Sequence, residues 1–237
     1  MKGGAIRPWT SLVQKEKSRR RRETRTKSFR DKVPWLGPTI WWLSSLYFVA
    51  QIVVAWVWIP SYSWLRNTIS DLGATSCGPK LCSPRHDWMN AEFIALGFIM
   101  AAGSLLIFQE FAERGPEERL AARIGFSCLA LGGVGAVLVG LFPENTVAVM
   151  HIIGAGFAIG VGTLGILVLG VVLSLPTGLA WAMRVVAPLA LTALVLFAFH
   201  VHLGMGAGTM ERLAAYPETI WLVIFGIYIS RTHSTTS

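Results

Sequence analysis

The chain has 237 residues, of which 53% are hydrophobic and only 14% are charged, and its mean hydropathy is +0.54. Soluble domains carry about a quarter charged residues, so this composition excludes a water-soluble globule, and the length allows one domain at most. The net charge of +8 is unevenly spread. Residues 1–37 hold twelve of the 21 Lys and Arg residues and three acids, whereas the remainder holds nine basic and ten acidic side chains. The sequence therefore predicts a basic tail joined to an apolar, nearly neutral body.

The tail, residues 1–34, is rich in Ser, Thr and Arg and contains four consecutive arginines at 19–22. It is too polar to bury a core, so we expect it to be disordered and cytoplasmic. Each basic residue near an anionic membrane surface contributes about 1 kcal/mol of attraction. No aromatic stacking motif accompanies the arginines, which disfavours nucleic acid as a partner. We therefore expect membrane lipids as partners.

Six apolar stretches are long enough to cross a membrane as helices, which needs about 20 residues. They cover 39–59, 88–108, 124–142, 149–173, 185–205 and 213–230. The last is the weakest, because only twelve residues separate Glu218 from Arg231. This span must therefore either include residues 213–216 or keep Glu218 near an interface, and five spans are the alternative. The prediction is an all-α, polytopic transmembrane bundle of six spanning helices in residues 35–231, followed by a short C-terminal tail, 232–237.

The positions of Lys and Arg predict the orientation, because these residues accumulate on the cytoplasmic side. An even number of spans puts both termini on one side, and the basic tail makes that side cytoplasmic. Seventeen Lys and Arg residues then lie inside and four outside. We expect a multi-pass protein of the cell membrane. Tryptophans favour the interfaces, so Trp35, Trp41, Trp42 and Trp181 are expected at the inner one and Trp56, Trp58, Trp64, Trp88 and Trp221 at the outer one.

Glycines cluster in the third and fourth spans, including the pair Gly156-x-x-x-Gly160. Small residues at this spacing let membrane helices approach closely. We interpret the glycines as packing residues, and they predict that helices three and four are neighbours.

Unusual polar residues gather at the predicted outer face. Ionisable groups near a bilayer are costly and usually face a bundle interior or an aqueous cavity, so they are candidates for function. The catalytic candidates are Asp71, His86, Glu144 and His151, and the binding candidates are Ser70, Asn90, Glu211, Arg212 and His200.

The helix ends refine two of these positions. Ser83 followed by Pro84 predicts a helix start with Ser83 as N-cap, which places His86 and Asn90 one turn apart on the same face. His200 and His202 would point in nearly opposite directions on an intact helix, so at most one of them faces a cavity.

Asp71, His86 and His151 are of the residue types that bind zinc. No compact motif such as His-Glu-x-x-His is present, and the three residues come from separate segments. Zinc is therefore a candidate cofactor, and a group of hydrogen-bonded histidines without metal explains the pattern at least as well.

Three cysteines are present. Cys77 and Cys82 lie in the first outer loop, where a disulfide can persist, and the Gly-Pro between them permits a tight turn. We expect a structural disulfide between them, and we interpret Cys128 as a small core residue.

The polar residues also fall within motifs that resemble a known family. Asn67-Thr68-Ile69-Ser70-Asp71-Leu72-Gly73, Asn90, Gly140-Leu141-Phe142-Pro143-Glu144 with His151, Glu211-Arg212 and Trp221 are similar to the pattern of the bacterial and archaeal membrane family called domain of unknown function 998 (DUF998). The resemblance covers residues 35–230 and implies about six spans and the location of the site. Its short Ile-Ser-Asp-x-Gly element also resembles eukaryotic autophagy-modulator membrane proteins. The family has no assigned activity, and the tail and the Cys77/Cys82 pair depart from its pattern.

Three functions fit this sequence. In the first, the outer polar residues bind a lipid headgroup or tie the helix ends together, and the protein organises membrane lipid. In the second, Asp71, His86 and His151 perform acid–base or zinc-assisted hydrolysis or transfer on a lipid or lipid-linked substrate, by analogy with alkaline ceramidases. The third, transport of protons or a small solute, ranks last, because the inner half of the bundle holds almost no ionisable residues and no broken inverted repeats. Binding is favoured over catalysis, and the ligand and the oligomeric state stay open.

Overall fold

The structure is a computed structural model that describes residue 14 and residues 36–78, 82–111 and 113–234. The predicted disordered tail, 1–34, lies outside the described residues apart from residue 14. Within the described part the regular elements are helices, and a single isolated bridge joins Ile59 and Cys82. Six helices are long and apolar enough to cross a membrane, as predicted: Leu36–Trp56, His86–Phe111, Pro116–Leu141, Ala148–Val172, Thr177–Ala198 and Ala207–Thr232. The all-α transmembrane bundle is confirmed.

Two of the six spans are interrupted by tighter or wider turns. The first consists of α2 (Leu36–Trp42), a 3-10 turn (Leu43–Ser45) and α3 (Leu46–Trp56). Ser44 and Ser45 donate hydrogen bonds to carbonyls three residues earlier, a local bonding that accompanies the tighter turn. The fourth span consists of α6 (Ala148–Ala155), a π-helical turn and α7 (Gly162–Val172). The remaining helices are α4 (His86–Ile107), α5 (Pro116–Leu141), α8 (Thr177–Ala198) and α9 (Ala207–Ser234).

Glycines bring α5 into backbone contact with α6 and α7, so the predicted proximity of helices three and four is confirmed. A Cβ atom added to Gly135 would lie 2.5 Å from the backbone oxygen of Gly154 in α6, and one added to Gly132 would lie 3.2 Å from the Cα of Gly162 in α7. The predicted Gly156-x-x-x-Gly160 pair is not at this contact, because Gly156 has nothing within 4 Å of such an atom and Gly160 meets only a leucine of α8. The small residues that do pack are shifted by two positions, onto the other face of the helix.

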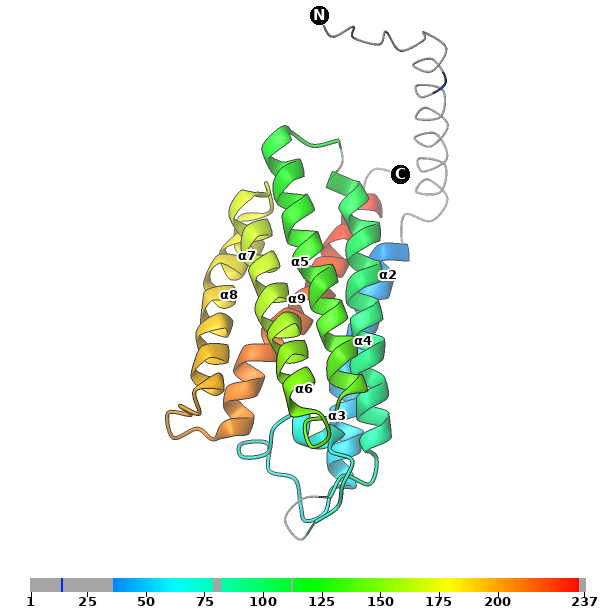
Figure 1. Ribbon diagram of the computed structural model, residues 1–237. Coiled ribbons are helices and arrows are strands. Elements are labelled where there is room, and N and C mark those ends of the chain that lie inside the picture. The colour runs from blue at the N-terminus through cyan, green and yellow to red at the C-terminus, as the bar shows by residue number, and fades with distance from the viewer. Residues whose placement is uncertain (1–13, 15–35, 79–81, 112, 235–237) are drawn as a thin grey trace, which may run out of the picture. The chain divides into compact units, whose positions relative to one another are not determined.

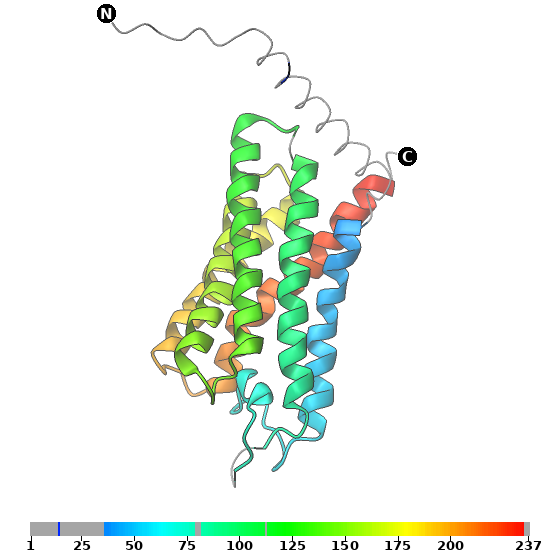
Figure 2. The same cartoon turned by 45° about the vertical axis from the view of Figure 1, so that its right-hand side comes forward.

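Helix α9 crosses the bundle obliquely. It begins beside α8 and ends beside α2, as both views show (Figure 1 and Figure 2). Near its end, Gly226 lies against the backbone of Pro38. Helices α8 and α9 therefore diverge along their length.

The aromatic core lies where α2 and α9 meet. The rings of Trp41 and Trp221 are 5.4 Å apart, and Trp221 stacks on Phe225 at 4.7 Å. Trp41 is completely buried. The prediction that Trp41 marks the inner interface and Trp221 the outer one is therefore wrong for this pair, because two residues in contact inside the bundle cannot mark opposite interfaces.

Several helix limits differ by six residues or more from those predicted, and the changes at the end of α8 and the start of α9 move candidate residues. Helix α8 ends at Ala198, seven residues early, because His200 and Leu203 adopt positive φ angles of 58° and 49° in the following turn. Helix α5 starts at Pro116, eight residues early, since proline is favoured in the first turn. Helix α9 starts at Ala207, so Glu218 lies eleven residues into it, about 16 Å along the axis.

Candidate functional site

A loop segment joins α3 to α4, and its described residues, 57–78 and 82–85, cover one end of the bundle, called here the loop end (Figure 1). A short 3-10 turn, Ser70–Gly73, forms within it. Asp71 accepts a hydrogen bond from the backbone N–H of Thr68 at 2.8 Å, and its own N–H donates to the Thr68 hydroxyl at 3.0 Å. These reciprocal bonds resemble a capping box. They fix the start of the turn, and they place the neighbouring Ser70 toward the helices.

Two bonds hold this turn against the start of α4. The Ser83 hydroxyl donates to the carbonyl of Leu72 at 2.6 Å, and Asn90 donates to the carbonyl of Gly73 at 2.9 Å. Ser83 is therefore not the N-cap: α4 begins at His86, and the structure gives its N-cap residue no side-chain capping bond. Competition from the Leu72 carbonyl explains why the predicted cap does not form.

The predicted disulfide between Cys77 and Cys82 is present. Beside it, the N–H of Ile59 donates to the carbonyl of Cys82 at 3.1 Å. The backbone bond thus links the two ends of the loop segment, and the disulfide joins two residues near its second end.

Three polar side chains from three parts of the chain meet at Ser70. Its hydroxyl lies 2.8 Å from a carboxyl oxygen of Glu211 on α9 and 3.0 Å from Nε2 of His151 on α6. The other Glu211 oxygen accepts a hydrogen bond from the backbone N–H of Ile69. His151 Nδ1 lies 2.9 Å from the carbonyl of Phe142. Ser70, His151 and Glu211 are called the polar network below.

Counting hydrogens shows that this network can hold a proton at either end. His151 Nδ1 faces a carbonyl and must carry a hydrogen. If Ser70 donates to Glu211, then His151 Nε2 must donate to Ser70, and the imidazole is doubly protonated. If Ser70 donates to His151 instead, then Glu211 must be the protonated group that donates to Ser70. The Ser70 hydroxyl can therefore pass a proton between the carboxyl and the imidazole.

Arg212 binds the loop segment to α9. Its guanidinium donates to the carbonyls of Trp64 and Asn67 at 2.9 Å each, to the hydroxyl of Tyr62, and to the hydroxyl of Tyr216 at 3.2 Å. The Tyr62 and Trp64 rings also lie 5.5 and 4.9 Å from it, within cation–π range. Burial is the main reason that the pKa of Tyr62 is raised above its ordinary value. These contacts make Arg212 a structural residue.

Glu144 and Asp71, which are both partly buried, form a pair of acids at the loop end. Burial, then the hydrogen bond to Asp71 and the charges of Asp71 and Glu211, raise the pKa of Glu144 to about 8. Its neighbour Asn145 accepts a hydrogen bond from the N–H of Thr75 at 3.0 Å. The turn between α5 and α6 is thereby joined to the loop segment.

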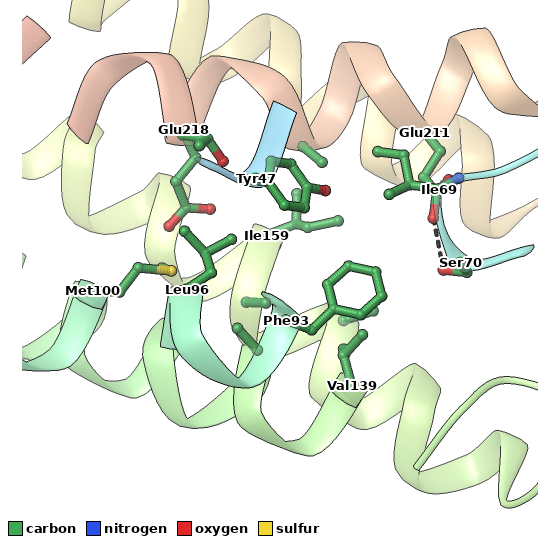
Figure 3. Close-up of a pocket in the computed structure, with 15 residues that line it drawn as sticks. Tyr47, Ile69, Ser70, Phe93, Leu96, Met100, Val139, Ile159, Glu211 and Glu218 are labelled. Carbon is green, nitrogen blue, oxygen red and sulfur yellow. Dashed lines mark hydrogen bonds between the residues drawn. The ribbon is translucent and has the colours of Figure 1, made fainter. Parts of the chain in front are cut away.

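A small cavity of about 60 Å³ extends from the polar network into the bundle. Ser70 and Glu211 form one end of it and Glu218 the other, as Figure 3 shows. Between them the wall is mostly apolar, with Tyr47, Phe93 and Met100 among its residues.

A second, larger cavity of about 470 Å³ lies among α7, α8 and α9. Its lining is almost entirely apolar and includes Met183, Ala187 and Trp221. Two further lining residues, Val186 and Ile220, are 40% and 45% exposed at the bundle surface. The cavity therefore borders the surface that faces lipid. It lies where α8 and α9 diverge, and Glu218 is the residue that it shares with the small cavity.

The structure unites only part of the predicted site. Ser70, His151 and Glu211 meet, and Asp71 and Glu144 pair beside them. His86 contacts the carbonyl of Ser83 at 2.9 Å, and Asn90 contacts that of Gly73, so both serve the local loop. His200 is exposed beyond the end of α8, where its ring lies 6.3 Å from that of His202.

The residues do not fit a zinc ion. Within 36–78, 82–111 and 113–234, no three His, Cys, Asp or Glu side chains gather closely enough to hold a metal. Asp71, His86 and His151 each bind a different backbone group of their own surroundings. The predicted zinc ligand set is therefore not assembled.

The sequence left two positions open for Glu218, near an interface or inside a span that includes residues 213–216, and the structure has it deep in α9. The larger cavity was missed, because its wall looks like any lipid-facing helix surface in the sequence.

The sequence profile of a family described as "Protein of unknown function (DUF998)" matches residues 42–228. Comparison with curated proteins and with solved structures finds no match.

Proposed function

The chain belongs to the DUF998 family of membrane proteins, and we propose that it binds a lipid-like amphiphile between its helices and does not transform it. In this proposal the loop end faces the cell exterior, and its polar groups hold the helix ends in place around the ligand.

The observation that carries the proposal is the larger cavity. Its volume of about 470 Å³ falls in the range of 300–1,000 Å³ that is typical of small-molecule sites. Its apolar lining suits a hydrocarbon chain, and the exposure of Val186 and Ile220 offers a lateral entrance from the bilayer. A water-soluble ligand would gain little from such walls.

Arg212 and the polar network support a structural role for the loop end. Arg212 distributes its donors among loop carbonyls and tyrosines, and Glu211 accepts bonds from the loop at both oxygens. Groups that are engaged in this way hold three parts of the chain together, and few donors are left over for a substrate.

Substitution of Val186 by Trp tests the proposal, because the larger side chain fills the cavity from its entrance. Val185→Trp is the matched control: Val185 is the adjacent residue, is 43% exposed, and is not part of the cavity wall. The protein is purified in a mild detergent, and co-purified lipid is quantified by mass spectrometry. We expect V186W to lower the bound lipid at least about tenfold, a loss of about 1.4 kcal/mol, and V185W to leave it unchanged. Equal lipid in all three proteins would refute the proposal.

A second candidate function, hydrolysis of a lipid ester, is favoured by one observation. Ser70 lies 3.0 Å from His151 Nε2, and the ring is oriented through its other nitrogen by the carbonyl of Phe142. This is the pattern of a nucleophile, a base and an orienting group. Against it, the next two backbone N–H groups, of Asp71 and Leu72, are bonded to Thr68 and Ile69, which leaves neither of them to stabilise an oxyanion.

Covalent labelling separates the two candidates. A fluorophosphonate reacts with an activated serine, so a hydrolase would be labelled in the wild type and not in Ser70→Ala. We expect no labelling that depends on Ser70, so the wild type and Ser70→Ala should react equally.

A further inference from the structure

Glu218 is a buried acid inside the membrane-spanning part of α9. It is 4% exposed, and its Oε1 has no hydrogen-bond partner among the described residues. The absence of a side chain at Gly162 makes room for it, since an added Cβ would overlap the Glu218 carboxyl. A buried polar atom without a partner costs about 1–3 kcal/mol. An acid retained at such a cost in the hydrocarbon region is a candidate for function.

The Glu218 carboxyl points into the small cavity (Figure 3). The volume of about 60 Å³ accommodates a few water molecules, since one needs about 10–15 Å³. Water in this cavity would have polar partners at both ends: Glu218 at one, and Ser70 and Glu211 at the other. The cavity therefore offers a short hydrogen-bonded path from Glu218 to the loop end.

The titratable groups that face this path are few. Tyr47 contributes a phenol from α3, Glu211 a carboxyl from α9, and His151 an imidazole from α6 through Ser70. The cavity walls from α4 and α5 contribute only apolar side chains. No ion pair with Glu218 occurs in the part of the chain that the structure describes.

We propose that Glu218 is a proton-binding site within the membrane, which exchanges its proton with the loop end through water in the small cavity and the Ser70 hydroxyl. A proton leaves the Glu218 carboxyl and binds a water molecule. The last water donates a proton to the Ser70 oxygen, and Ser70 gives its own hydrogen to Glu211 or to His151 Nε2. Only O–H and N–H bonds form and break, and the polar network gains one proton. The same proton transfers in the reverse order protonate Glu218.

This proposal does not depend on a ligand in the larger cavity. Glu218 lines both cavities, so its protonation also sets the charge at the wall of the larger one.

Infrared difference spectroscopy tests the proposal on the full-length protein in lipid vesicles. The C=O stretching band of a protonated carboxyl is assigned to Glu218 by its loss in Glu218→Gln. After transfer from H₂O to D₂O, the shift of this band reports proton exchange. We expect the exchange to be at least about tenfold slower in Ser70→Ala, which removes the relay hydroxyl. We expect the same in Ala215→Leu, which fills the cavity and leaves the polar network intact.

Ser104→Ala is the matched control, because Ser104 is a fully buried serine of α4 outside the cavity wall, and exchange should keep the wild-type rate. Absence of a band that disappears in E218Q would overturn the proposal, since Glu218 would not hold a proton. Exchange at the wild-type rate in A215L would also overturn it, even if S70A is too unstable to measure. If exchange is slowed as much in S104A as in A215L, the proposal is also overturned, because a change in packing anywhere in the bundle would then slow the exchange.

Discussion

Glu211 and Glu218 lie two turns apart on α9 and are both almost completely buried, at 5% and 4% exposure. Glu211 accepts bonds from the backbone of Ile69 and the hydroxyl of Ser70, whereas Oε1 of Glu218 has no partner among the described residues. The loop segment makes the difference, because it reaches into the bundle end as far as Glu211 and no further. The loop segment therefore binds one acid and does not reach the other, and our proposal concerns the second.

Removal of the guanidinium beside Glu211 should have the largest effect on stability. Arg212→Ala would leave the carbonyls of Trp64, Asn67 and Gly208 without this donor. We expect the free energy of unfolding to fall by about 3 kcal/mol, because bonds to a charged group are strong and these carbonyls would lose this donor. Unfolding by SDS in mixed micelles, followed by circular dichroism, measures it.

Arg66→Ala is the control, since Arg66 is an exposed arginine of the same loop segment. It should change the free energy of unfolding by less than about 0.5 kcal/mol. Similar losses in both variants would mean that the loop end is not held by Arg212 in particular.

The acid pair at the loop end should make stability depend on pH. The pKa of Glu144 is about 8 in the folded protein and 4.5 as the reference value for the unfolded chain. Between these values the folded state holds a proton that the unfolded state has released, so the free energy of unfolding falls as the pH rises. We expect a loss of about 2 kcal/mol between pH 5 and pH 8, less than the full shift implies, because Glu144 is only partly buried.

Glu144→Gln removes this titration and should flatten the profile over the same interval. The measurement is the SDS midpoint at each pH for both proteins. A profile that rises with pH in the wild type would contradict the direction of the pKa shift.

The comparison of the two glutamates can be made directly with isosteric changes. Glu211→Gln replaces a carboxyl that accepts two bonds from the loop, and we expect a loss of about 1.5 kcal/mol. Glu218→Gln replaces a carboxyl whose Oε1 has no partner among the described residues, and we expect a change within about 0.5 kcal/mol. Equal losses, measured by the same SDS titration, would remove the distinction between the two acids.

The fold was largely predictable. Six spans follow from hydropathy, because a membrane imposes the same length and apolarity on every crossing helix. The errors lie at the helix ends. Hydropathy marks only the apolar part of a helix, so the prediction omitted the first turns of α5. It also extended α8 beyond its observed end at Ala198, across the turn that contains His200. The tryptophan prediction failed for Trp41 and Trp221 because an indole ring also packs well in an aromatic core.

The site was predictable in part. Ser70, His151 and Glu211 were picked out individually, since polar residues near a bilayer are rare, and the structure places them within hydrogen-bond distance. Their mutual arrangement could not be predicted, because contacts across more than 80 positions depend on how the helices pack. The same limit explains the zinc prediction, which treated suitable ligand types as if they shared one location.

Apolarity and the distribution of Lys and Arg belong to the chain itself, so membrane class, helix content and the number of spans can be read without coordinates. Pairing of polar groups and the presence of cavities depend on the oblique path of α9 and on how far the loop segment reaches. Those are outcomes of packing between distant segments, where a single glycine such as Gly162 decides whether a carboxyl fits. Only the tertiary structure could therefore distinguish Glu211, which accepts hydrogen bonds from the loop segment, from Glu218, whose carboxyl points into the small cavity.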